Sequence, residues 1–133
     1  MKLMVATLVL LLAVLLAACG GGTPDIELAE SQTDLGVVTN GETPTIEIAV
    51  RNLGEGDLVI EGVSTSCGCT SASITPEVIP AGGTGTLAIR YDSGAHGPDE
   101  VGPVMRQIFI ASNDPDEAEF EFRLIADVIP AQP

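Results

Sequence analysis

Two cysteines separated by a single glycine, Cys67-Gly68-Cys69, are the chemically unusual feature of this 133-residue chain. In an extended strand, residues two apart lie on the same face at about 6.6 Å from each other. That distance is near the upper limit of about 6.8 Å for the Cα atoms of a disulfide. Gly68 would let the chain tighten into a turn and shorten it. One interpretation of the motif is therefore a structural disulfide or a packed thiol pair.

The same residues are typical of two other kinds of chemistry. Two thiolates on one face suit Cu(I), which prefers soft ligands. Zinc would need four ligands, and the obvious donors are Cys67, Cys69 and the single histidine, His96, in a glycine-rich loop. Met105 could add a thioether, but we expect it to pack in the core. The third interpretation is thiol–disulfide exchange, which the missing Cys-x-x-Cys spacing and βαβ context disfavour.

The remaining cysteine, Cys19, ends an apolar N-terminal segment that follows the charged Met1-Lys2 pair. This arrangement is typical of a secretory signal peptide, and its ending, Leu16-Ala17-Ala18-Cys19, resembles the lipobox of bacterial lipoproteins. The resemblance implies that residues 1–18 are removed and that Cys19 carries a diacylglyceryl thioether. The alternative is an uncleaved transmembrane helix, but the stretch lies at the short edge of the roughly 17–25 residues required.

The lipobox divides the chain into four parts. They are the signal peptide at residues 1–18, the lipidated cysteine with a flexible tether at 19–25, one domain at 26–130 and a tail at 131–133. Two or more acyl chains suffice for stable anchoring, and the tether reaches on the order of 13 Å. We therefore expect an extracytoplasmic domain held close to its membrane, at the cell surface or the periplasmic face.

The chain is strongly acidic, with 19 Asp and Glu against five Lys and Arg and a formal net charge of −14. Removal of Lys2 with the signal peptide makes the mature chain more negative still, with a charge of −15. Phosphates of nucleic acids and anionic headgroups would repel such a surface. The expected partners are thus the membrane, through the lipid anchor, and an unidentified protein, but no nucleic acid.

The elements that must position the cysteines are strands, because apolar residues beyond residue 26 alternate with period two. The stretch from Val104 to Ile110 is apolar on both faces near its end, which predicts a central strand, with Arg106 in phase with Ile108 and Ile110. Asn40-Gly41 is a hairpin signal. About seven strands with turn signals every 8–12 residues predict an all-β, immunoglobulin-like sandwich. The expected strands cover residues 25–28, 35–38, 45–51, 58–63, 84–91, 104–110 and 119–128.

Several of these segments resemble a bacterial family of domains of unknown function, family 1573. The resemblance covers about residues 33–128, and Ala81 departs from it where the family usually has a second proline. It implies an immunoglobulin-like sandwich related to ASH/Hydin-type domains, usually exported and often lipid-anchored, without an established catalytic mechanism. The matching motifs are Asn52-Leu53-Gly54, Ser66-Cys67-Gly68-Cys69-Thr70, Ile79-Pro80-Ala81-Gly82 and Ser112-Asn113-Asp114-Pro115.

Hydrolytic chemistry has little support in the sequence. There is no Gly-x-Ser-x-Gly elbow, and one histidine in a glycine-rich loop is a poor member of a catalytic triad. We therefore expect a non-enzymatic binding or structural module, with residues 92–103 and 67–73 as contact regions. The alternative is a small lipoprotein that uses Cys67 and Cys69 for soft-metal binding or thiol redox chemistry, with His96 as a further metal ligand.

Overall fold

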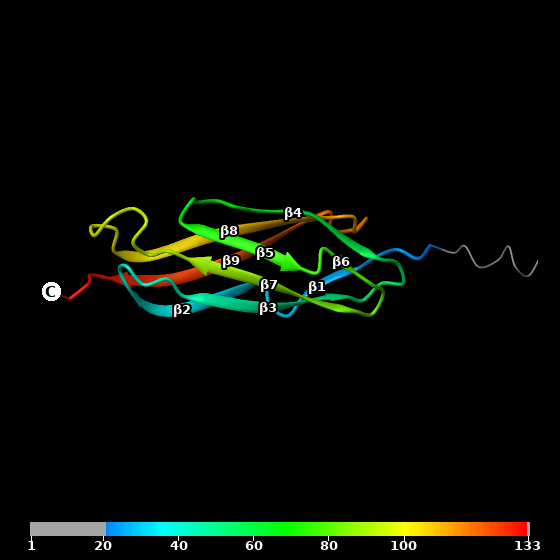
Figure 1. Cartoon of the computed structure of the whole chain (residues 1–133), viewed down its shortest axis with the longest axis horizontal. Coiled ribbons are helices and arrows are strands. Elements are labelled where there is room, and N and C mark those ends of the chain that lie inside the picture. Colours follow the sequence, from blue (N-terminus) through cyan, green and yellow to red (C-terminus); the bar gives the residue numbers. More distant parts are fainter. Residues whose placement is uncertain (1–20, 133) are drawn as a thin grey trace, which may run out of the picture.

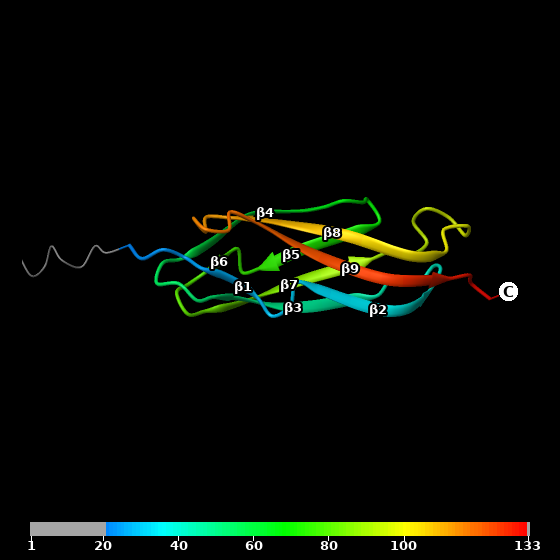
Figure 2. The same cartoon turned by 180° about the vertical axis from the view of Figure 1, so that it is seen from behind.

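The computed structural model describes residues 21–132, so Cys19 and the predicted signal peptide lie outside the described residues. This part of the chain is built of strands packed as two facing sheets (Figures 1 and 2). The strands are β1 (Ile26–Leu28), β2 (Gln32–Thr39), β3 (Thr45–Asn52), β4 (Leu58–Thr65), β5 (Thr70–Thr75), β6 (Val78–Ile79), β7 (Thr84–Tyr91), β8 (Gly102–Ser112) and β9 (Glu119–Ile129).

One sheet has the strand order β1-β3-β7-β5 and the other the order β2-β9-β8-β4-β6. The predicted all-β sandwich is confirmed, and β8 is central in its sheet, as its apolar faces indicated. The structure adds two strands to the seven expected, β5 and β6. The first is mostly Ser and Thr and has little hydrophobic alternation, and the second is only two residues long. Neither could give a clear period-two signal.

The core lies between the sheets and is filled by the inward-facing residues of the alternating strands. On β8, Ile108 and Ile110 are fully buried, and Phe122 of β9 packs with them. Met105 points the other way and is 52% exposed, so the expectation that it packs in the core is wrong. It sits on the outer face because its neighbour Arg106 takes the inward phase of the strand.

The Asn40-Gly41 turn is not a hairpin. It follows β2 in the five-stranded sheet and leads to β3 in the four-stranded sheet, so it crosses between the layers. Gly41 has a φ of 95°, a conformation that favours glycine. The sequence signal thus located the tight turn correctly, but the turn joins strands of different sheets.

Two side chains fasten the loops at the end of the sandwich where the described chain begins. Asn52 is fully buried and accepts hydrogen bonds from the backbone N–H groups of Asp25 and Gly54. Its amide donates to the carbonyl oxygens of Gly56 and Ile79, at 2.7 and 2.9 Å. Asn52 therefore joins the N-terminal segment, the β3–β4 loop and β6 through one side chain.

Asp114 has the corresponding role between β1 and the β8–β9 turn. Its carboxylate is 3% exposed and accepts hydrogen bonds from the backbone N–H groups of Ile26, Asp116 and Glu117, at 2.8, 2.8 and 3.1 Å. Burial by itself raises the pKa of Asp114, but these three donors outweigh it and hold the pKa below its ordinary value. The Ser-Asn-Asp-Pro motif thus has a structural role, because it joins β1 to the β8–β9 turn.

The N-terminal segment is hydrogen-bonded to the domain before β1 begins. The carbonyl of Thr23 accepts from Glu55 and Gly56, and that of Asp25 accepts from Leu53. Thr23 and Asp25, which the sequence places in a flexible tether, are therefore fixed to the domain. This segment lies at one end of the long axis, whereas the β7–β8 loop and the C-terminus lie at the other (Figures 1 and 2). No helix that could cross a bilayer is found among residues 21–132.

Candidate functional site

Cys67 and Cys69 lie in the short turn between β4 and β5, at the end of the sandwich opposite the N-terminal segment (Figure 1). Their sulfur atoms are joined in a disulfide, and their Cα atoms are 5.2 Å apart. The Thr65 hydroxyl donates to the carbonyl oxygens of Cys67 and Thr70, both at 3.0 Å. The turn is thereby closed by its own flanking strands, which fixes the positions of both cysteines.

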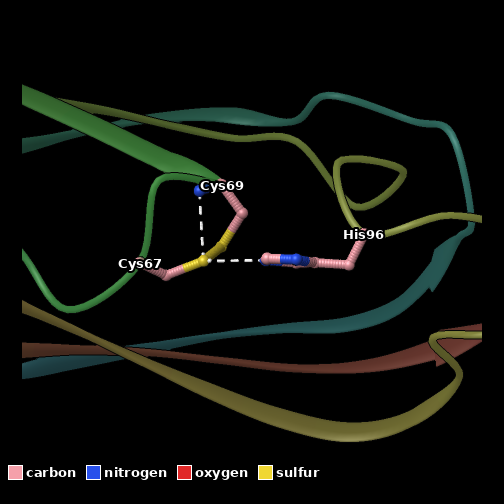
Figure 3. A group of neighbouring side chains, drawn as sticks. All are labelled: Cys67, Cys69 and His96. Carbon is pink, nitrogen blue, oxygen red and sulfur yellow. Dashed lines mark hydrogen bonds between the residues drawn. A yellow bond between two sulfur atoms is a disulfide. The ribbon is translucent and has the colours of Figure 1, made fainter.

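The turn brings His96 to Cys67, with 3.1 Å between the histidine Nε2 and the cysteine Sγ (Figure 3). His96 lies in the β7–β8 loop, 29 residues further along the chain, and it is exposed on its outer side. His96, which the sequence places in a glycine-rich loop, is therefore part of the cysteine cluster.

Internal hydrogen bonds hold the β7–β8 loop in place. The backbone N–H of Asp92 donates to the carbonyl of Cys69 at 2.8 Å, which ties the loop directly to the cysteine turn. The Asn40 amide donates to the carbonyls of Ser93, Gly97 and Glu100, at 3.0 to 3.3 Å. The same crossing turn that carries Asn40-Gly41 thus supports the loop that carries His96.

Cys69 has a different neighbour, Arg106 of β8. The guanidinium Nε donates to the Cys69 Sγ at 3.1 Å, and a terminal nitrogen donates to Glu100 Oε1 at 2.8 Å. The guanidinium carbon lies 5.7 Å from the centre of the Tyr91 ring, within range of a cation–π interaction. The Arg106 side chain is 15% exposed. A mostly buried cation therefore stands beside the less accessible of the two sulfurs.

Sequence reasoning did not identify Arg106 as part of a site, although it did place Arg106 in phase with Ile108 and Ile110. An arginine on the core face of a strand is rare unless it is paired. Its place on the same face as Ile108 and Ile110 was the sequence signal that could have identified Arg106 as a paired, functional residue. Its partners could not be found in the same way, because Cys69 and Glu100 come from other segments.

Tyr91 and Glu100 complete the polar surroundings of Arg106. Tyr91 is 1% exposed, and within residues 21–132 neither its hydroxyl nor Glu100 Oε2 has a hydrogen-bond partner. Burial raises the pKa of Tyr91, although the Arg106 guanidinium beside it lowers the pKa in part. Tyr91 therefore stays a neutral phenol beside the Arg106–Glu100 ion pair, which lies next to the disulfide.

The ligand atoms of Cys67, Cys69 and His96 all lie within 4.8 Å of one another. With the cysteines reduced, two thiolates and an imidazole form a soft donor set of the kind that suits Cu(I). Met105 lies on the outer face of β8 and is not part of this set. The predicted lipidation site, Cys19, falls outside the described residues.

A family model described as "Protein of unknown function (DUF1573)" matches residues 26–128. Among curated proteins, none matches the sequence significantly. A protein of unknown function from Porphyromonas gingivalis W83 has a similar structure, with a TM-score of 0.72 and 28% identity. That match covers 79% of this chain but only 47% of the other, so the chain spans about half the length of that protein.

More distant structures share the sandwich. The ASH/PapD-like domain of human CEP192 matches 80% of this chain and 87% of its own, with a TM-score of 0.60 and 14% identity. The E. coli chaperone DraB matches 84% of this chain and 59% of its own, with a TM-score of 0.55 and 10% identity. At such identities the likeness extends to the fold alone.

Proposed function

The chain belongs to the DUF1573 family of proteins of unknown function, and within that family we propose that it is a lipid-anchored, extracytoplasmic, non-enzymatic binding module. One observation carries the proposal: the two contact regions expected from the sequence meet at one end of the sandwich. The Asp92–Cys69 backbone bond and the contact between His96 and Cys67 join them. A surface that is already ordered loses less conformational freedom when it binds.

The position of this end supports the anchor as well. The described chain begins at the opposite end, where Thr23 and Asp25 are bonded to the β3–β4 loop. A lipid on Cys19 would hold that end near the membrane and present the cysteine turn away from it. The test is the intact mass of the protein purified from membranes. We expect residues 1–18 to be absent and Cys19 to carry acyl chains; an unmodified Met1 would refute the anchor.

The environment of His96 supports a non-enzymatic role. Its Nε2 faces the sulfur of Cys67, which is held in the disulfide and is therefore no free nucleophile for hydrolysis. The acidic surface further supports a protein partner over a nucleic acid, because a formal charge of −15 repels phosphates.

The binding proposal is tested by a pull-down from native membranes with the acylated protein. Asp99→Arg alters the exposed β7–β8 loop, and Glu119→Arg makes the same charge change at the opposite end. We expect Asp99→Arg to lose the partner and Glu119→Arg to retain it. Equal recovery with both variants would mean that the partner binds elsewhere.

A second candidate function is Cu(I) binding by Cys67, Cys69 and His96, favoured by the 4.8 Å limit on the distances between their ligand atoms. It is tested by titrating the reduced protein with Cu(I) against a chromophoric chelator. One equivalent should bind, the Cys67→Ser/Cys69→Ser variant should bind none, and His96→Ala should bind more weakly. Unchanged binding by the double variant would exclude this site.

A further inference from the structure

The surroundings of the two sulfurs differ in accessibility and in how well they stabilise a negative charge. Cys69 is 3% exposed, lies 3.1 Å from the Arg106 guanidinium and has the Thr70 hydroxyl 3.5 Å from its sulfur. Cys67 is only partly buried, faces the exposed His96 and accepts a hydrogen bond from the backbone N–H of Cys69 at 3.1 Å, a neutral donor, whereas the donor at Cys69 is a cation. An external reagent can therefore reach Cys67 more easily, whereas negative charge is better stabilised on Cys69.

The pairing of Arg106 is incomplete while the disulfide is intact. A guanidinium has five N–H donors and binds anionic acceptors most strongly. The sulfur of a disulfide is a weak, neutral acceptor. Within residues 21–132 Glu100 is the one carboxylate that pairs with Arg106, and the other terminal nitrogen donates to the neutral carbonyl of Met105 at 3.3 Å. A thiolate on Cys69 would give Arg106 a second anionic partner at the same position. Arg106 must then stabilise the reduced state relative to the oxidised one.

From this asymmetry we propose that Cys67–Cys69 is an exchangeable disulfide of fixed polarity, reduced by a protein with a vicinal dithiol. A thiolate of that dithiol attacks the Cys67 sulfur, forming a mixed disulfide and breaking the Cys67–Cys69 bond. The bonding electron pair leaves with the Cys69 sulfur, which becomes a thiolate beside Arg106.

The second half of the exchange releases the partner. Its other thiolate attacks its own sulfur in the mixed disulfide, which closes a disulfide in the partner and expels Cys67 as a thiolate. Two electrons pass to the cysteine pair, and the two protons lost by the partner's thiols go to solvent. His96, with its Nε2 3.1 Å from the Cys67 sulfur, can donate an N–H to this second thiolate.

This activity goes beyond the proposed binding function, since it depends on neither the lipid anchor nor a stable partner. It also gives the cluster two states, because only the reduced pair offers two thiolates to a metal. The test of polarity needs no substitution at the site. The oxidised wild-type protein is exposed to reduced glutathione, quenched with iodoacetamide and mapped by peptide fragmentation.

Glutathione should be found on Cys67 and the alkyl group on Cys69, in a ratio of at least tenfold over the reverse pattern. Glutathione mainly on Cys69, an even distribution, or no reaction with the folded protein would overturn the proposal. A failed pull-down or an absent lipid would leave this result unchanged, so the two proposals fail separately.

The role of Arg106 is tested by equilibrating the protein with defined ratios of reduced and oxidised dithiothreitol. Arg106→Met should shift the equilibrium about tenfold toward the disulfide, which is about 30 mV for a two-electron couple. Arg106→Lys should recover part of the shift. The control is Arg123→Met, which removes an arginine paired with Glu121 on the outer face of β9 and should leave the equilibrium unchanged. Wild-type behaviour of a folded Arg106→Met protein would contradict the role.

Discussion

Replacing Asn52 by Ala should destabilise the domain more than any other exchange of an asparagine for alanine. The substitution removes two donated and two accepted hydrogen bonds from a fully buried side chain. The carbonyl of Ile79 is buried and would lose this partner, which costs about 1–3 kcal/mol. The three part-buried partners can recover some hydration and should cost about 0.5–1 kcal/mol each. The expected loss is about 2.5–6 kcal/mol.

The assay is urea unfolding at neutral pH of the chain from residue 19 onward, with Cys19→Ser. Asn113→Ala is the matched control, because Asn113 also bonds the backbone, to Val59 and Asp57, but in an exposed position. We expect a loss of about 1 kcal/mol there. Asn52→Asp should destabilise at least as much as Asn52→Ala, since a carboxylate would face two carbonyl oxygens. Equal losses for Asn52→Ala and Asn113→Ala would refute the reasoning from burial.

Three further outcomes are expected. Asp114→Asn should destabilise the domain by about 2–3 kcal/mol at neutral pH, since one side of the amide must face a backbone donor. Because the pKa of Asp114 is lowered in the folded state, its stabilisation is present above about pH 4 and is lost as the pH falls through that lowered pKa. Urea unfolding at several pH values should therefore show the unfolding free energies of the wild-type and Asp114→Asn proteins converging in acid. A constant difference between them would count against this role. Asn40→Ala should loosen the β7–β8 loop, seen as faster amide hydrogen exchange at Gly97 and Glu100, with the β3–β7 ladder unaffected; unchanged exchange would mean that other contacts hold the loop. Met105→Gln should change the unfolding free energy by less than about 0.5 kcal/mol, because this side chain is exposed; a loss of the size of a core substitution would place it inside.

The alternating pattern predicted most of the strands, because alternation with period two indicates directly which face of a strand is buried. It did not predict β5 and β6, which are polar or very short and complete the sheet edges through backbone hydrogen bonds. The Asn40-Gly41 signal gave the turn but not its partners. A turn of this kind leaves open whether the two strands pair or cross to the other sheet.

The cysteine cluster was harder to foresee, since its members come from three separate segments. Cys67 and Cys69 could be singled out by type and spacing alone. The contact with His96 depends on how the β7–β8 loop folds back, which in turn depends on Asn40 and on the Asp92–Cys69 bond. Arg106 was visible only as a polar residue in an apolar phase. Such long-range contacts have no local signature.

The measurement that tests the binding account most directly is site-specific photo-crosslinking in intact cells. A photoreactive residue is placed at position 99 in the β7–β8 loop or at position 119 at the opposite end. The account predicts a discrete protein adduct from position 99 and none from position 119. Cys67→Ser/Cys69→Ser should weaken the position-99 adduct, because it removes the disulfide and the sulfur that His96 of the loop contacts. Adducts from position 119 alone, or from neither position, would contradict it.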